Sequence, residues 1–128
     1  MNDIEVKLRE ILLPVLGLDD VDDVDPQHAL VNDLGADSLD FVEIVFLVEK
    51  NFGVSIETKE LLSGGVKDAG DSVFTDGKLT EDGLELVREN IPENPLRFSV
   101  GMTKVEIFRQ ITVRDLAILI ARRKNGGA

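Results

Sequence analysis

The sequence predicts an all-α fold, a helical bundle with an inserted segment of short helices and loops. Apolar residues recur at three- and four-residue spacing in several segments, which places them on one face of a helix. Residues that cap helix N-termini, aspartate or threonine, stand directly before most of these segments. Because 128 residues suit one domain, we expect residues 1–128 to form a single domain with an insertion at about 57–110.

The composition is acidic and free of cysteine. The chain has 25 acidic and 14 basic residues, a formal net charge of −11. This charge repels the phosphates of nucleic acids, which argues against a nucleic-acid partner, and it favours partner proteins with basic docking patches. The plainer interpretation is that the charge serves solubility alone. The absence of cysteine excludes disulfides, thiolate catalysis and cysteine metal sites.

The chain has no sequence signal for export or for a membrane. Met1 to Glu5 lack the basic start and apolar run of a signal peptide, and no apolar stretch approaches the length that spans a bilayer. We therefore expect a cytoplasmic protein with no membrane span, and a monomer.

A first helix is predicted from Asn2 or Asp3, either of which can cap it, to about Leu16. Its single apolar stripe consists of Ile4, Leu8, Ile11, Leu12 and Val15. Pro14 is expected to distort or end the last turn, and Gly17 is a suitable C-terminal stop.

Residues 18–36 are predicted to form a long acidic loop. Its anchors to the core are expected to be Val21, Val24, Leu30 and Leu34. An EF-hand needs a glycine at its sixth position and a glutamate at its twelfth, and no register of this loop supplies both. A dedicated metal site is therefore not expected here, whereas loose binding of divalent cations stays open.

The segment from Leu34 to Asp40 predicts a sharp turn followed by a capped helix. Gly35 permits the turn, Asp37 is a good N-cap, and Asp40 then falls where its carboxylate reaches back towards free amides. With Asp37 as the cap, the Ser38 hydroxyl has no structural duty. It is expected to stand exposed beside a helix N-terminus, a position that favours an attached phosphate.

The helix from Ser38 to about Asn51 carries two apolar stripes. The stripe expected to dock on the bundle consists of Phe41, Ile44, Val45, Val48 and Phe52. The second stripe consists of Leu39, Val42 and Phe46, bordered by Asp37, Asp40 and Glu43. An apolar strip edged by carboxylates is typical of a partner surface, although a small bundle could also bury both stripes.

The inserted segment predicts several short elements. Glu57 to Leu62 suit a short turn of helix, and Thr75 to Lys78 form a tight-turn sequence. Thr80 can cap a helix through about Glu89. Thr103 and Glu106 are a capping-box pair, which predicts a short helix to about Arg109.

The insert is too apolar to be a flexible linker. Its apolar residues that need a place to pack are Leu61, Leu62, Val73, Phe74, Leu84, Leu86, Ile91, Leu96, Phe98, Met102 and Phe108. We therefore expect the insert to fold onto the bundle.

A last helix is predicted from Val113 to about Lys124, capped by Thr112. Its buried side is expected to consist of Val113, Leu116, Ala117, Ile120 and Ala121. The basic residues in its last turn complement the negative end of the helix dipole. Residues 126–128 are expected to fray.

The run Leu34-Gly35-Ala36-Asp37-Ser38-Leu39-Asp40 resembles the attachment site of the acyl carrier protein family. In that family a Leu-Gly-x-Asp-Ser-Leu core presents a serine that carries 4'-phosphopantetheine. The resemblance covers residues 1–56 and about 111–124. It implies an acyl-carrier-like four-helix bundle, in which the insert replaces the short third helix and adds a patch for a particular partner or acyl group.

The resemblance also implies the function. Ser38 would carry 4'-phosphopantetheine covalently, and the thiol of that arm would hold acyl groups as thioesters. The chain would be no enzyme but a substrate of phosphopantetheinyl transferase and of acyl-transferring or chain-extending enzymes, as a specialised member in fatty-acid, lipid or polyketide-type synthesis. The positions that match the family's partner-recognition residues are Asp37, Leu39, Asp40, Val42, Glu43 and Phe46.

Two other classes of protein compete with this interpretation. A serine hydrolase with Ser38 as nucleophile needs a base and an oxyanion hole. The only histidine, His28, lies in the acidic loop, and the chain has no Gly-x-Ser-x-Gly elbow. A non-acylated acidic interaction module needs only a serine at a helix start, which leaves the surrounding motif residues without a purpose.

Overall fold

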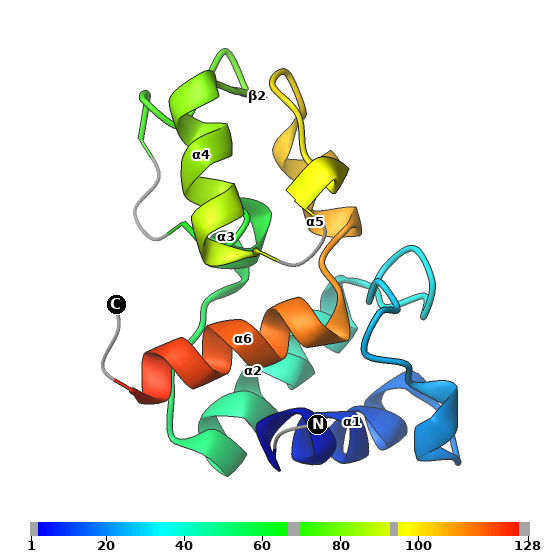
Figure 1. The fold of residues 1–128 in the computed structure, drawn as a ribbon. Coiled ribbons are helices and arrows are strands. Elements are labelled where there is room, and N and C mark those ends of the chain that lie inside the picture. Colours follow the sequence, from blue (N-terminus) through cyan, green and yellow to red (C-terminus); the bar gives the residue numbers. More distant parts are fainter. Residues whose placement is uncertain (1–2, 67–69, 93–94, 126–128) are drawn as a thin grey trace.

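The structure is a computed structural model that describes residues 3–66, 70–92 and 95–125 (Figure 1). The expectations on Asn2 as a cap and on a frayed tail at 126–128 lie outside these residues. In chain order the elements are α1 (Asp3–Leu16), η1 (Val21–Asp23), α2 (Ser38–Phe52), α3 (Thr58–Leu62), β1 (Phe74–Thr75), β2 (Lys78–Leu79), α4 (Glu81–Asn90), η2 (Pro95–Arg97), α5 (Lys104–Arg109) and α6 (Val113–Lys124). The all-α prediction is confirmed, with one small hairpin added.

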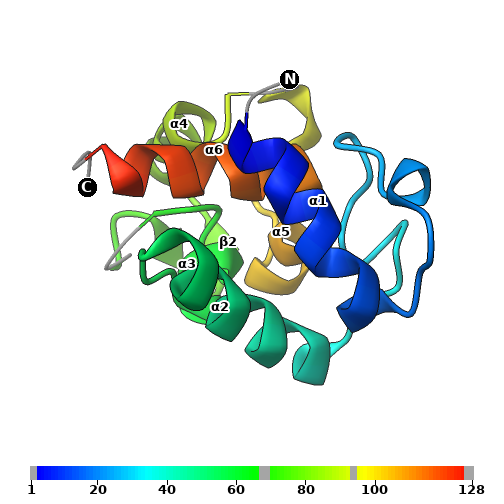
Figure 2. The same cartoon turned by 90° about the horizontal axis from the view of Figure 1, so that it is seen from below.

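The helices α1, α2 and α6 pack against one another as the bundle, which forms the near layer when the molecule is seen from below (Figure 2). Pro14 lies inside α1, which continues to Leu16 and ends at Gly17 with φ +69°. The glycine rather than the proline therefore ends this helix, because its left-handed backbone conformation closes the last turn.

The insert stands on the other side of α6 from α1 (Figure 1). Asp76 and Gly77, both at positive φ, form the tight turn that was expected, and Phe74 pairs with Leu79 across it. The Leu79 amide donates to the Met102 carbonyl at 2.9 Å, so the hairpin also holds the chain just before α5. The chain just before α5 is thereby held to the hairpin rather than to the bundle.

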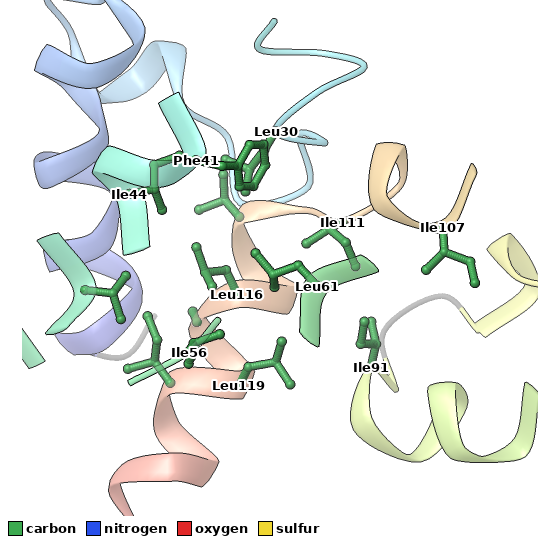
Figure 3. Packing of buried hydrophobic residues seen from close by; sticks show 14 of the residues in the cluster. Leu30, Phe41, Ile44, Ile56, Leu61, Ile91, Ile107, Ile111, Leu116 and Leu119 are labelled. Atoms are coloured by element: carbon green, nitrogen blue, oxygen red, sulfur yellow. The ribbon is translucent and has the colours of Figure 1, made fainter. Parts of the chain in front are cut away.

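Apolar side chains of the insert and of the bundle belong to one buried cluster. Figure 3 shows Leu61 beside Ile111 and Leu116, with Ile91 and Ile107 extending the cluster towards α4 and α5. These five residues are at most 1% exposed. The insert therefore packs on the bundle and shares its hydrophobic core.

Two ion pairs fasten the insert to α6. The Arg97 guanidinium contacts both Asp115 carboxylate oxygens, at 2.9 and 3.0 Å, and donates to the Gln110 carbonyl. Asp115 is fully buried and also accepts from the Thr112 amide at the start of α6. The second pair joins Arg123 to Glu60 at 2.5 Å. One carboxylate of α6 thus serves both as a helix cap and as the anchor of the insert.

Candidate functional site

The long loop between α1 and α2 is held to the start of α6. The Leu30 amide donates to the Ile111 carbonyl at 2.9 Å, and the Val113 amide donates to the His28 carbonyl at 3.0 Å. The Ala36 amide then donates to the Leu30 carbonyl at 2.8 Å. These backbone hydrogen bonds hold the end of the loop against the segment that leads into α6, and they therefore set the point at which α2 begins.

The start of α2 is closed by a reciprocal capping box. Gly35 makes the turn at φ +72°, and Asp37 is extended. The Asp40 amide donates to Asp37 Oδ1 at 2.9 Å, and the Asp37 amide donates to Asp40 Oδ2 at 3.0 Å. The prediction that Asp37 caps the helix with help from Asp40 is confirmed.

Ser38 is the first residue of α2, and it is exposed. Within the described part of the chain its hydroxyl makes no hydrogen bond. The cap is supplied by its neighbours, and the positive end of the α2 dipole lies beside it. The structure thus presents an exposed serine hydroxyl at a helix start, as the sequence predicts.

An apolar pocket of about 340 Å³ lies beside Ser38. Its lining comes from the loop and the start of α2, from α3 and from α5, and consists of Val31, Ala36, Asp37, Ser38, Phe41, Thr58, Leu62, Val105, Phe108 and Arg109. The rings of Phe41 and Phe108 lie 4.4 Å apart at a tilt of 47°. Of the lining residues that the structure describes, half belong to the insert, so the insert shapes the space next to the hydroxyl.

The sequence alone does not place these insert residues at the site. It predicts Phe108 and Leu62 only as apolar residues that need a partner, and Arg109 only as the end of a short helix. The capping box of Thr103 and Glu106, which is confirmed, sets where α5 begins. The side of the bundle that α5 faces depends on packing, so no signal in the sequence could place it beside Ser38.

The second stripe of α2 is exposed. The exposed fractions of Leu39, Val42 and Phe46 are 78%, 65% and 62%. Asp37 and Glu43 are exposed beside this stripe, whereas Asp40 is half-buried. The interpretation that the bundle buries both stripes is therefore wrong, while the expected docking stripe is buried at Phe41, Ile44, Val48 and Phe52. Phe46 also borders a hollow of about 270 Å³.

The surroundings of Ser38 contain no histidine. His28 does not line the pocket, and its Nδ1 accepts from the Asp25 amide at 3.3 Å. Among the described residues no group of three or more histidines, aspartates and glutamates is arranged to hold a metal ion.

Near the pocket, hydrogen bonds from Thr103 hold the pKa of Glu106 below its ordinary value, and Arg109 adds to this effect. Across the described residues no helix has the length and hydropathy to span a membrane.

Fold and site together define a small helical protein that presents one serine hydroxyl beside an apolar pocket. The family described as "Phosphopantetheine attachment site" matches residues 6–65. Acyl carrier proteins from two strains of Nitratidesulfovibrio vulgaris, DP4 and Hildenborough, are each 40% identical over 73 residues, which cover 55% of this chain and 92% of the relative. No solved structure gives a significant match.

The chain belongs to the acyl carrier protein family. Its prosthetic group is a covalently attached 4'-phosphopantetheine, and its role is that of a carrier that interacts with transferases and synthesis enzymes. Carriers of this family are not catalytic.

Proposed function

We propose that Ser38 is the residue that carries 4'-phosphopantetheine. The observation that carries this proposal is the exposed hydroxyl of Ser38, which makes no hydrogen bond within the described residues and lies at the capped start of α2 beside an apolar pocket. When bound, the arm supplies a thiol that forms thioesters with acyl groups.

The residues around Ser38 fit such a group. The carboxylates of Asp37 and Asp40 each accept the other residue's backbone amide at the helix start, so the Ser38 hydroxyl is free to form a phosphodiester bond. The N-terminus of α2 stabilises a negative charge next to it. The apolar pocket, which Phe41 and Phe108 border, suits a hydrocarbon chain.

Intact mass measurement tests the attachment residue. The protein is incubated with coenzyme A and a broad-specificity phosphopantetheinyl transferase, beside Ser38→Ala and the control Ser55→Ala, which alters another exposed serine. We expect a gain of one phosphopantetheine on the wild type and on Ser55→Ala, and none on Ser38→Ala. No gain on the wild type would leave the non-acylated interaction module as the better interpretation.

We further propose that the exposed stripe of Leu39, Val42 and Phe46, with Asp37, Asp40 and Glu43 beside it, docks partner enzymes that carry basic patches. Its support is the exposure of three large apolar side chains between carboxylates on one helix. Charge complementarity raises the association rate and still permits fast release, which suits a carrier that visits several enzymes.

The docking proposal is tested by the transferase reaction under subsaturating carrier. Phe46→Ser should lower the rate at least about threefold while leaving the fold intact, because surface substitutions change stability by less than about 0.5 kcal/mol. The control is Val100→Ser, which removes an apolar side chain of similar exposure from the insert, away from the pocket. An equal effect of the two variants would contradict a docking role for the stripe.

We also propose that the chain is one carrier domain with an insertion at about 57–110, and that it serves fatty-acid, lipid or polyketide-type synthesis as a specialised member. The support is that insert and bundle share one apolar cluster and that the insert lines half of the pocket. A single unfolding transition, coincident for circular dichroism and for NMR signals of both regions, is expected. Amides of residues 70–92 that exchange without protection in the loaded protein would contradict it.

A further inference from the structure

Arg109 brings a positive charge to the pocket beside Ser38. It is the last residue of α5, in the insert, and it lines the same pocket as Asp37 and Ser38. Among the lining residues that the structure describes, it is the one cationic residue. The nearest acidic residues of the pocket rim and of its own helix are Asp37 and Glu106, and hydrogen bonds within capping boxes engage both.

The other arginines near the core are anchored. Arg9, Arg97 and Arg123 donate to backbone carbonyls, and Arg97, Arg114 and Arg123 form ion pairs with carboxylates. The Arg109 side chain is exposed, and within the described residues it makes neither a hydrogen bond nor an ion pair. Its interaction with Glu106 is the ordinary attraction between charges three positions apart on a helix. The guanidinium is thus available for a ligand in the pocket.

A phosphodiester on Ser38 is an anion that suits the Arg109 guanidinium at the pocket. It would add a negative charge beside Asp37, in a chain whose formal net charge is already −11. A planar guanidinium with several N–H donors suits phosphate oxygens better than an ammonium does. Without a cation on the rim, repulsion would favour an arm that points away from the carboxylates and into solvent.

We propose that Arg109 binds the phosphodiester of the prosthetic arm and directs the arm across the pocket towards α3 and α5. Arg109 is then a positioning residue that the insert contributes to the carrier site. This proposal rests on the attachment of the arm to Ser38. The insert then contributes a positive charge to the site as well as part of the pocket lining.

The test follows the arm itself. Because the chain has no cysteine, the thiol of the loaded arm is its only thiol, and a nitroxide spin label can be coupled there alone. Loading is first verified by intact mass. In the wild type, line broadening should concentrate on pocket residues such as Val31, Leu62 and Phe108, and the Arg109 Nε–H signal should shift on loading.

Three variants separate the charge from the fold. Arg109→Gln should reduce the broadening at the pocket residues roughly twofold, the change in population expected when an exposed charge pair is lost. Arg109→Lys should keep part of it. Lys104→Gln removes an exposed cation at the first residue of α5, where Lys104 Nζ lies over the Phe74 ring, and it should leave the broadening pattern unchanged.

The outcomes distinguish the two proposals. A wild type that gains no phosphopantetheine contradicts the attachment at Ser38. A loaded Arg109→Gln variant with the wild-type broadening pattern overturns the role of Arg109. If that variant is not loaded or does not fold, the loaded wild type is measured in about 1 M salt, where such a contact is screened. The Arg109 Nε–H shift should disappear there, and its persistence together with unchanged broadening would overturn the proposal.

Discussion

The bundle and the insert are stabilised in different ways. The bundle consists of α1, α2 and α6, each at least 12 residues long, which bury broad apolar faces. The insert consists of pieces such as α3, with five residues, and α5, with six. Helices this short are not stable alone, so the insert depends on a few specific contacts. Single substitutions at these buried contacts should therefore cost more stability than substitutions at exposed positions of the insert.

Removing the contact between Arg97 and Asp115 should produce the largest loss of stability. The side chains of the two residues are 12% and 0% exposed. Arg97→Ala would leave a buried carboxylate without its cation, which costs about 3 kcal/mol of the free energy of unfolding in comparable pairs. Urea unfolding followed by circular dichroism measures this loss.

The matched control is Lys59→Ala. Lys59 pairs with Glu57 at 3.3 Å, but these side chains are mostly exposed, and such pairs contribute less than about 1 kcal/mol. Equal effects of the two substitutions would mean that burial does not distinguish the anchor of the insert from a surface pair.

Gly83→Ala should produce the next largest effect, with a sign opposite to helix propensity. Alanine in place of glycine inside a helix ordinarily adds up to about 1 kcal/mol. Here a Cβ at Gly83 would clash with the Val73 carbonyl oxygen and would lie 2.8 Å from Leu79 Cδ1. We expect a loss of about 2 kcal/mol by overpacking between α4 and the hairpin.

The control for this substitution is Gly70→Ala, because a Cβ at Gly70 meets no atom within 4 Å. Its free energy of unfolding should stay within about 0.5 kcal/mol of the wild type. A stabilised Gly83→Ala would show that the hairpin and α4 are not in close contact in solution.

Salt should stabilise both regions, because each carries an excess of acidic residues. Raising the ionic strength from about 0.01 M to 0.15 M shortens the screening length from about 30 Å to 8 Å and weakens self-repulsion. We expect the Tm to rise by a few degrees, with a similar rise in millimolar divalent cations. A Tm independent of salt would contradict this account of the charge.

The smallest expected effect concerns Glu106. Its folded-state pKa lies below the ordinary value of 4.5, because it accepts hydrogen bonds from Thr103. The charge therefore stabilises α5 above that pH, and this contribution is lost as the pH falls through the lower folded-state pKa. Glu106→Gln should lower the Tm slightly at neutral pH and not at a pH well below 4.5. A difference in Tm that persists in acid would indicate a packing effect instead.

Much of the site was predictable because its cause is local. Asp37, Thr80, Thr103 and Thr112 were expected to cap helices, and all four accept the hydrogen bonds of caps. A cap involves residues three positions apart, so a single stretch of sequence contains both partners. The placement of Ser38 at the start of α2, exposed and without a structural hydrogen bond, follows from the same local rule.

The remaining features were decided by packing between distant segments. The burial of one stripe of α2 and the exposure of Leu39, Val42 and Phe46 depend on where α1 and α6 lie. The meeting of Arg97 with Asp115, 18 residues apart, and the arrival of Phe108 and Arg109 beside Ser38 depend on how the insert returns to the bundle. Local sequence patterns therefore predict the helices, their caps and the serine that the motif presents. The residues that lie next to that serine follow from tertiary packing, because side chains far apart in the chain meet according to the packing of whole elements rather than by local spacing.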